Sequence, residues 1–168
     1  MNDSFILRDR IWREQNERVT LSSNATFASK STGRYLDEEP DAFRTCFERD
    51  RDRIIHSKTF RRLKHKTQVF INPDGDHFIT RMTHTLNVTQ IGRSIAKTLG
   101  LNPDLTEAIC LGHDVGHSPF GHTGEDVLNE MLDGGWSHSE NSVRMLSVIE
   151  PLNPVSYTHL TLPTSDLV

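Results

Sequence analysis

The sequence has few of the features that mark secreted or membrane proteins. Its 168 residues include two cysteines, Cys46 and Cys110, which lie far apart and outside any CxxC pair. They predict free thiols in a reducing cytosol and argue against a disulfide framework. No run of about 18 apolar residues is present, so no transmembrane helix is expected. The first residues lack a basic segment followed by an apolar one, so we expect no signal peptide and predict a cytoplasmic protein.

An excess of positive charge is also absent. The chain carries 19 Lys and Arg against 23 Asp and Glu, a formal net charge of −4, which argues against a globally basic nucleic-acid-binding protein. One local segment departs from this balance, with cations at Lys58, Arg61, Arg62, Lys64 and Lys66. Such a segment is typical either of a solvated helix face or of a surface that contacts phosphate or nucleic acid, and both interpretations stay open.

Helical patterns dominate the rest of the chain and predict an all-α fold. Residues 1–40 predict a helix followed by a polar, turn-rich arm. Residues 41–153 predict the main helical domain, with a possible small β-hairpin near 68–80 around the turn-forming run 72–76. Residues 154–168 have no helical period and resemble a non-native tail, so we exclude them from fold reasoning and expect the natural chain to be truncated near Asn153.

The clearest predicted helix spans 82–99 and carries the first histidine of interest. One narrow face of that helix presents His84, Val88, Ile91, Ile95 and Leu99 at helical spacing, so this face, with His84 on it, is expected to be buried. Gly100 is expected to end this helix. The next helix is predicted to begin at Asn102 and Pro103 and to be buried around residues 108–111.

A His-Asp doublet, His113-Asp114, follows at the end of that buried helix and is expected to point inward. It opens the run 112–122, which also contains His117 and His122. Together with His84 on the preceding helix, the doublet offers one carboxylate and two imidazoles, a mixed nitrogen and oxygen ligand set that suits Mn, Fe, Zn or Mg. Farther along, the pattern 137–140 predicts a capping box, which places His138 in the first turn of another helix.

These motifs together resemble the dGTPase-like branch of the HD-domain phosphohydrolases. The resemblance rests on the run 112–122, on 81–85 and on 51–68, and it covers roughly residues 25–150. It implies a truncated HD-domain helical bundle, corresponding to the N-terminal part of such an enzyme. It also implies a divalent metal ion and hydrolysis of deoxynucleoside triphosphates to deoxynucleoside and inorganic triphosphate.

The resemblance assigns a role to eight residues of this chain. It implies three metal ligands, which are His84, His113 and Asp114. It implies a catalytic histidine and four substrate-binding residues, which are His138 and then Arg81, His117, His122 and Gln68. The family's fourth metal ligand is an aspartate on a much later helix, and Asp126 and Asp133 follow the doublet too closely to match it. The fourth ligand is therefore expected to be missing.

Two other functions remain open at this stage. One is a different HD-type reaction, on a phosphomonoester or a cyclic nucleotide. The other is a nucleic-acid-binding module that uses the basic segment, with a vestigial metal site. The resemblance further implies a deoxynucleoside triphosphate substrate, a homo-oligomer and single-stranded nucleic acid as an effector, and no membrane partner is expected.

Overall fold

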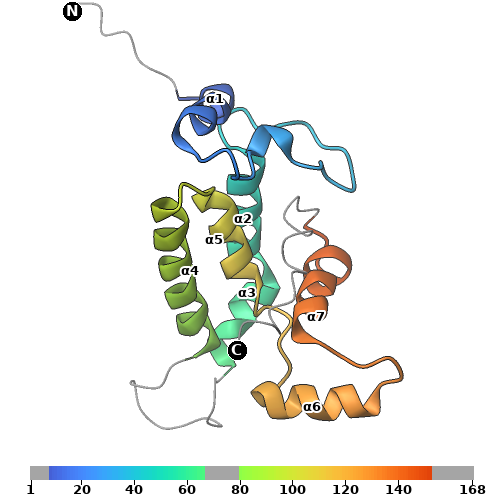
Figure 1. The fold of residues 1–168 in the computed structure, drawn as a ribbon. Helices are drawn as coiled ribbons and strands as arrows, with labels where there is room; N and C mark the ends of the chain where they lie inside the picture. Colours follow the sequence, from blue (N-terminus) through green and yellow to red (C-terminus); the bar gives the residue numbers. More distant parts are fainter. Residues whose placement is uncertain (1–7, 67–79, 153–168) are drawn as a thin grey trace, which may run out of the picture.

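The fold is all-α, as seen in a computed structural model that describes residues 8–66 and 80–152 (Figure 1). The helices are α1 (Arg10–Thr20), α2 (Cys46–His56), α3 (Lys58–Arg62), α4 (Arg81–Thr98), α5 (Pro103–Gly112), α6 (Gly121–Met131) and α7 (His138–Arg144). The remaining elements are two 3-10 turns and one π-helical turn, η1 (Ala28–Lys30), η2 (Leu63–His65) and η3 (Met145–Ile149). The described residues contain no strand, which confirms the predicted fold class. Nearly all of the hairpin predicted near 68–80, and the whole stretch 154–168, lie outside them.

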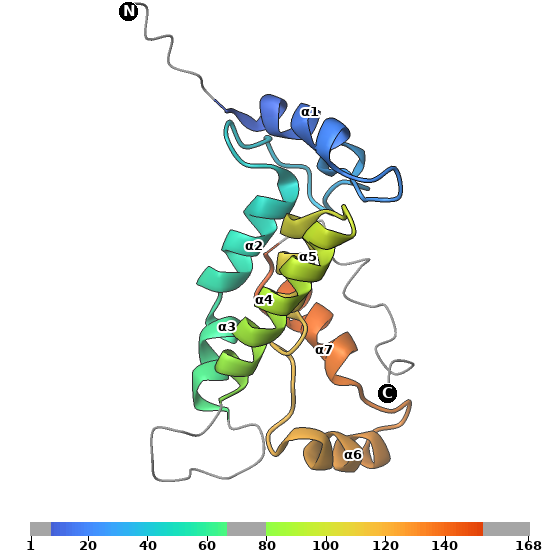
Figure 2. The same ribbon diagram turned by 60° about the vertical axis from the view of Figure 1, so that its left-hand side comes forward.

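Helix α5 is the centre of the bundle. It packs against α4 on one side and α2 on the other (Figures 1 and 2). Its burial was predicted, and the structure confirms it at Leu105, Ala108 and Leu111. The main core cluster consists of Ile54, Phe60, Leu63, Ala108, Leu111, Val115 and Leu146. This core supports the end of α5, where the His-Asp doublet follows.

Capping residues fix where these central helices begin. Helix α2 begins with a full capping box between Thr45 and Glu48, which satisfies two backbone N–H groups at its start. Asn102 caps α5 by accepting hydrogen bonds from the backbone of Asp104 and Leu105. Gly100 follows α4 with φ +69°, a conformation that favours glycine. The predicted junction between α4 and α5 is therefore confirmed.

The prediction that the apolar stripe of α4 is buried is wrong. Ile91, Ile95 and Leu99 on that stripe are exposed. The residues that pack against α5 are smaller, and they include the buried Thr85, Thr89, Ala96 and the intervening Gly92. A Cβ on Gly92 would lie 2.8 Å from the sulfur of Cys110 on α5. Small residues therefore face the neighbour because they allow the two helices to approach closely.

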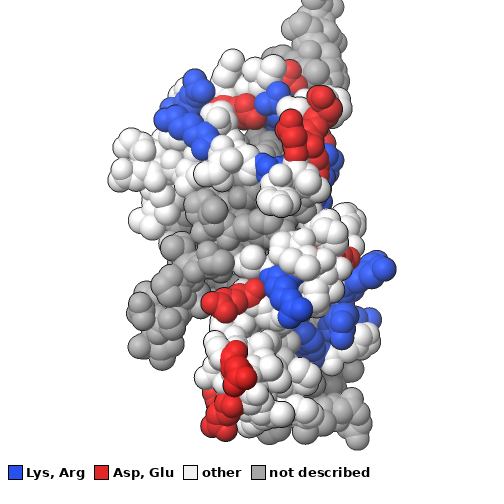
Figure 3. All heavy atoms as spheres, turned by 90° about the vertical axis from the view of Figure 1, so that its right-hand side faces the viewer, with Lys and Arg blue, Asp and Glu red and all other residues white. Residues whose placement is uncertain are grey.

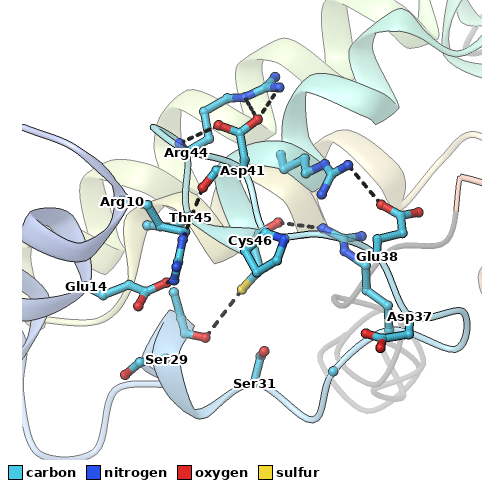
Figure 4. A pocket seen from close by; sticks show the side chains of 15 residues that line it. Arg10, Glu14, Ser29, Ser31, Asp37, Glu38, Asp41, Arg44, Thr45 and Cys46 are labelled. Atoms are coloured by element: carbon cyan, nitrogen blue, oxygen red, sulfur yellow. Dashed lines mark hydrogen bonds and ion pairs between the residues drawn. The ribbon is translucent and has the colours of Figure 1, made fainter.

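The arm before α2 is held by paired charges. Arg34 and the fully buried Asp50 form an ion pair at 2.7 Å. Figure 4 shows the hollow between this arm and α2, where Arg44 lies beside Asp41. Arginine and carboxylate side chains both line this hollow and largely neutralise one another, and these paired charges anchor the arm.

The loop after α5 is locked onto α7 by polar contacts. The Asn141 side chain donates to the carbonyl oxygen of Gly116 (2.6 Å), and the Ser142 hydroxyl accepts from the Gly116 backbone N–H (2.9 Å). The same hydroxyl lies 2.8 Å from the carbonyl oxygens of His113 and His138, and its one proton is donated to either of them. These contacts bring the His-Asp doublet and α7 to one end of the bundle, although they are far apart in sequence.

Candidate metal centre and histidine cluster

Three predicted metal ligands come together at the meeting point of α4 and α5. His84 lies in the first turn of α4, His113 is the C-cap of α5, and Asp114 follows it. One ligand atom from each lies within 4.8 Å of the other two. The two imidazole rings are 5.8 Å apart between centroids. The described residues that gather here thus offer two nitrogens and one oxygen.

Hydrogen bonds orient two of these donors toward a common point. His113 Nδ1 lies 2.7 Å from the carbonyl oxygen of Cys110, so Nδ1 carries the proton and Nε2 is left with its lone pair. Asp114 Oδ2 accepts from Arg81 at 2.9 Å, whereas Oδ1 lies 3.6 Å from His113 Nε2. A mixed donor set of this kind suits a divalent cation, so the residues fit the implied metal.

The ionisation of the triad also suits a cation. Burial raises the pKa of Asp114, but its electrostatic interactions with His113 and Arg81 outweigh burial and leave the pKa lowered. Burial lowers the pKa of His84, because a buried imidazole resists protonation. The carboxylate is therefore ionised and His84 is neutral near pH 7, the forms that bind metal.

Arg81 lies behind the triad. Its side chain is almost fully buried (the residue is 4% exposed), and its guanidinium pairs with Asp114. Its Nε is buried without a hydrogen-bond partner in the described structure. In the structure Arg81 therefore holds Asp114, a predicted metal ligand, in position. The phosphate-binding role of Arg81 stays a prediction.

A second cluster gathers next to the triad, and sequence reasoning missed one of its members. His117, His122, Glu125 and His138 each offer a ligand-type atom within 4.8 Å of the others. The rings of His117 and His138 stack at 4.7 Å between centroids. Three of these residues were predicted site residues, whereas Glu125 was not. Its spacing of three residues from His122 was the only available signal, because residues three apart share one face of a helix.

Glu125 fixes the orientation of His138. Its carboxylate accepts from His138 Nδ1 at 2.9 Å and from the His138 backbone N–H at 2.8 Å. Burial raises the pKa of Glu125, but the hydrogen bonds from His138 outweigh it and leave the pKa lowered. An ionised Glu125 therefore holds the proton on Nδ1 of His138 and leaves Nε2 as the ring atom available to a substrate.

His117 is the most buried of the four, at 3% exposure. Neither of its ring nitrogens has a hydrogen-bond partner in the described structure. Burial and the charge of Arg81 lower the pKa of His117 to about 4. His117 is therefore a neutral, buried imidazole at neutral pH.

This burial predicts a loss of stability in acid. The folded-state pKa of His117 lies below the ordinary value of 6.5, so its contribution is present above pH 6.5 and is lost as the pH falls toward 4. With a chelator present, we expect the free energy of unfolding of the parent to fall by about 1–3 kcal/mol more than that of His117→Gln between pH 7 and pH 4.

Urea unfolding at a series of pH values measures this difference. The matched control is His122→Gln, since the His122 side chain is 79% exposed and should leave the acid loss of the parent unchanged. Equal acid losses in the parent and in His117→Gln would refute the assignment.

The basic segment has two kinds of cation. Lys58, Arg61, Arg62 and Lys64 are exposed. Lys66 is half-buried, and its ammonium donates to the carbonyl oxygen of His117 at 2.8 Å. Figure 3 shows Lys and Arg side chains toward one edge of the lower half of the molecule, and Asp and Glu toward the other. Gln68, predicted to contact sugar and base, lies outside the described residues.

Comparison with known proteins finds a matching domain family and several similar proteins. The HD domain matches residues 81–158, which include the triad and the histidine cluster. The chain is 61% identical over 137 residues to a deoxyguanosinetriphosphate triphosphohydrolase-like protein of Caldanaerobacter subterraneus subsp. tengcongensis, covering 82% of this chain and 40% of that protein. It is 55% identical over 148 residues to a protein of the same description from Clostridium tetani, covering 88% of this chain and 42% of that protein.

The match covers only part of those relatives. The chain spans about two-fifths of the length of the two proteins named above. A third relative of the same description, from Pelagibacter ubique, is 59% identical over 124 residues, 33% of its length. Among the described residues, no helix is both long enough and apolar enough to cross a membrane.

Proposed function

The chain belongs to the HD-domain family, among the deoxyguanosinetriphosphate triphosphohydrolase-like proteins, and on that premise we propose that it carries the metal-holding and phosphate-handling part of a deoxynucleoside triphosphate triphosphohydrolase. The observation that carries the proposal is the adjacency of two units, which His117 links, because its ring interacts electrostatically with Asp114 and stacks on His138. One is the triad of His84, His113 and Asp114, and the other is the hydrogen-bonded pair of Glu125 and His138. A phosphoryl-transfer site needs both charge stabilisation and proton transfer.

The triad would hold the divalent ion. When bound, such an ion polarises a phosphoryl oxygen and lowers the pKa of a water molecule. Asp114 is kept ionised by Arg81, and the two histidines supply neutral nitrogens. The donor set suits Mn, Fe, Zn and Mg, so the coordination geometry and the availability of each metal determine which ion binds.

The reaction transfers the α-phosphoryl group to water. The water oxygen bonds to the α-phosphorus, the bond from that phosphorus to the 5′ oxygen breaks, the deoxynucleoside is the leaving group, and the three phosphates remain joined as inorganic triphosphate. The attacking water gives up a proton to solvent, and the 5′ oxygen needs one. His138 is proposed to deliver it from Nε2 in the doubly protonated form of the ring, in which the ionised Glu125 still accepts from Nδ1. His117 and His122 stand next to His138 and are proposed to face the phosphate oxygens.

Product analysis tests this proposal. Because the chain spans part of its relatives, the assay uses a chimera in which this chain replaces the matching 137 residues of the Caldanaerobacter protein. The chimera is given deoxyguanosine triphosphate with Mn²⁺, and the products are separated by anion exchange. Intact inorganic triphosphate supports the proposal. Release of phosphate or pyrophosphate would favour another HD-type reaction, and salt-dependent binding of nucleic acid without turnover would favour a binding module.

His138→Ala is expected to slow turnover by about 10²–10⁴-fold, because general acid catalysis contributes that much. Metal content should stay unchanged, since His138 is not in the triad. Glu125→Gln should slow turnover by less, because the ring remains but loses its fixed tautomer. Steady-state rates of the chimera measure both, and the exposed neighbour Asp126→Asn is the matched control. Full turnover by His138→Ala with metal retained would remove the role assigned to it.

A further inference from the structure

We propose that His117, His122, Glu125 and His138 form a second divalent-cation site, distinct from the triad, which takes a zinc-like ion. This goes beyond the proposed function, in which the three histidines act on substrate and Glu125 orients His138. The inference concerns a cation bound by the protein's own side chains, with no nucleotide present.

The first support is the donor set. Three imidazoles and one carboxylate, each with a ligand atom within 4.8 Å of the others, match the nitrogen and oxygen ligands that zinc takes in four-coordinate sites. They come from three elements, the loop after α5, helix α6 and the first turn of α7. The ring pairs His117–His122 and His122–His138 lie 5.2 and 5.9 Å apart.

The second support is independent of that spacing. Both ring nitrogens of His117 are buried and have no hydrogen-bond partner among the described residues. Buried polar atoms in proteins nearly always have a partner, and an exception calls for an explanation such as a bound ion. A cation at the cluster would take the lone pair of one of these nitrogens, and thereby explain why a histidine is buried there at all.

Access and charge also suit an ion. The His122 side chain is 79% exposed, so a hydrated ion can reach the cluster without disturbing the core. Glu125 supplies one negative charge, and Asp114 adds attraction at longer range, against repulsion from Arg81. The cluster therefore differs from a group of exposed carboxylates, because it combines the exposed His122 with the buried His117.

Occupancy would compete with catalysis if His138 acts as proposed above. A ring nitrogen that coordinates a cation cannot take part in proton delivery in the same way. Excess zinc is therefore expected to inhibit the enzyme while the triad is already filled. This consequence rests on the proposed function, whereas the existence of the site does not.

Counting bound ions tests the site directly. The 168-residue chain is stripped with a chelator, dialysed against Zn²⁺ and analysed for zinc per protein molecule, and Co²⁺ absorption gives the affinity of each site. We expect two ions in the parent and in the control Asp126→Asn. We expect one ion in His84→Ala, and one in His122→Ala, whose exposed side chain can be removed without disturbing the core.

The affinity and absorption of the ion that each variant still binds identify which of the two sites was lost. In His122→Ala we expect affinity at the second site to fall by about tenfold or more, with an unchanged melting temperature in the chelated state. A single ion in the parent, or two ions of unchanged affinity in His122→Ala, would overturn the proposal. Neither result depends on turnover, so a failed nucleotide assay with two bound ions would count against the proposed function alone.

Discussion

Asp114→Ala is expected to lower the free energy of unfolding by about 3–5 kcal/mol and to abolish metal binding at the triad. The physical reason for the first effect is Arg81, which is 4% exposed and pairs with Asp114 at 2.9 Å. Removing the carboxylate leaves a buried guanidinium without its counter-charge. The second effect follows because Asp114 supplies the only oxygen of the triad.

A double variant separates these two effects. Arg81→Met combined with Asp114→Ala removes the buried charge together with its partner, and replacing a buried ion pair by apolar groups is often nearly neutral. We expect the double variant to regain about 2 kcal/mol or more over Asp114→Ala, while metal binding stays absent. Urea unfolding measures the stability of the single and the double variant, and elemental analysis measures their metal content. An Asp114→Ala chain as stable as the parent would show that Arg81 does not depend on this contact.

Gly116→Ala is the second large effect expected, with a loss of about 3 kcal/mol or more. A Cβ at this position would collide with backbone atoms of Asn141 and Ser142. Backbone within a helix cannot move aside as a flexible side chain can, so the loop and α7 must separate. The hydrogen bonds that join Gly116 to both of these residues would be lost with the contact.

A glycine in open space provides the control for this variant. Gly134 has nothing within 4 Å of an added Cβ, although its φ of +103° is strained for alanine, so Gly134→Ala should cost only about 1 kcal/mol. In Gly116→Ala we also expect turnover by the chimera to fall, because this junction holds the loop after α5, with His117, against α7, with His138. A Gly116→Ala chain as stable as Gly134→Ala would mean that the close approach does not hold the site together.

Local signals account for what the sequence could predict. The Asn102 cap, Gly100 after α4, the burial of α5 and the start of α7 at His138 all depend on neighbouring residues, and the structure confirms each one. The grouping of His84, His113 and Asp114 could be expected as well, because the doublet ends a buried helix. The donor types suggested a divalent metal, and the family resemblance assigned the ligand role to each of these three residues.

What the sequence could not predict depends on packing between elements. The stripe of α4 was expected inside because it is apolar, but close approach to α5 favours Thr85 and Gly92 on the contact face. Glu125 was missed because its partner His138 is 13 residues away on another helix. The contact of Arg81 with Asp114 spans 33 residues, and no periodic pattern signals such a pair.

The most direct test of the central claim is to follow which bond breaks. The chimera is given deoxyguanosine triphosphate in water enriched with heavy oxygen, and the products are examined by phosphorus NMR and mass spectrometry. The account predicts inorganic triphosphate that carries one heavy oxygen and deoxyguanosine that carries none. Heavy oxygen in deoxyguanosine, or labelled phosphate or pyrophosphate in place of triphosphate, would contradict it.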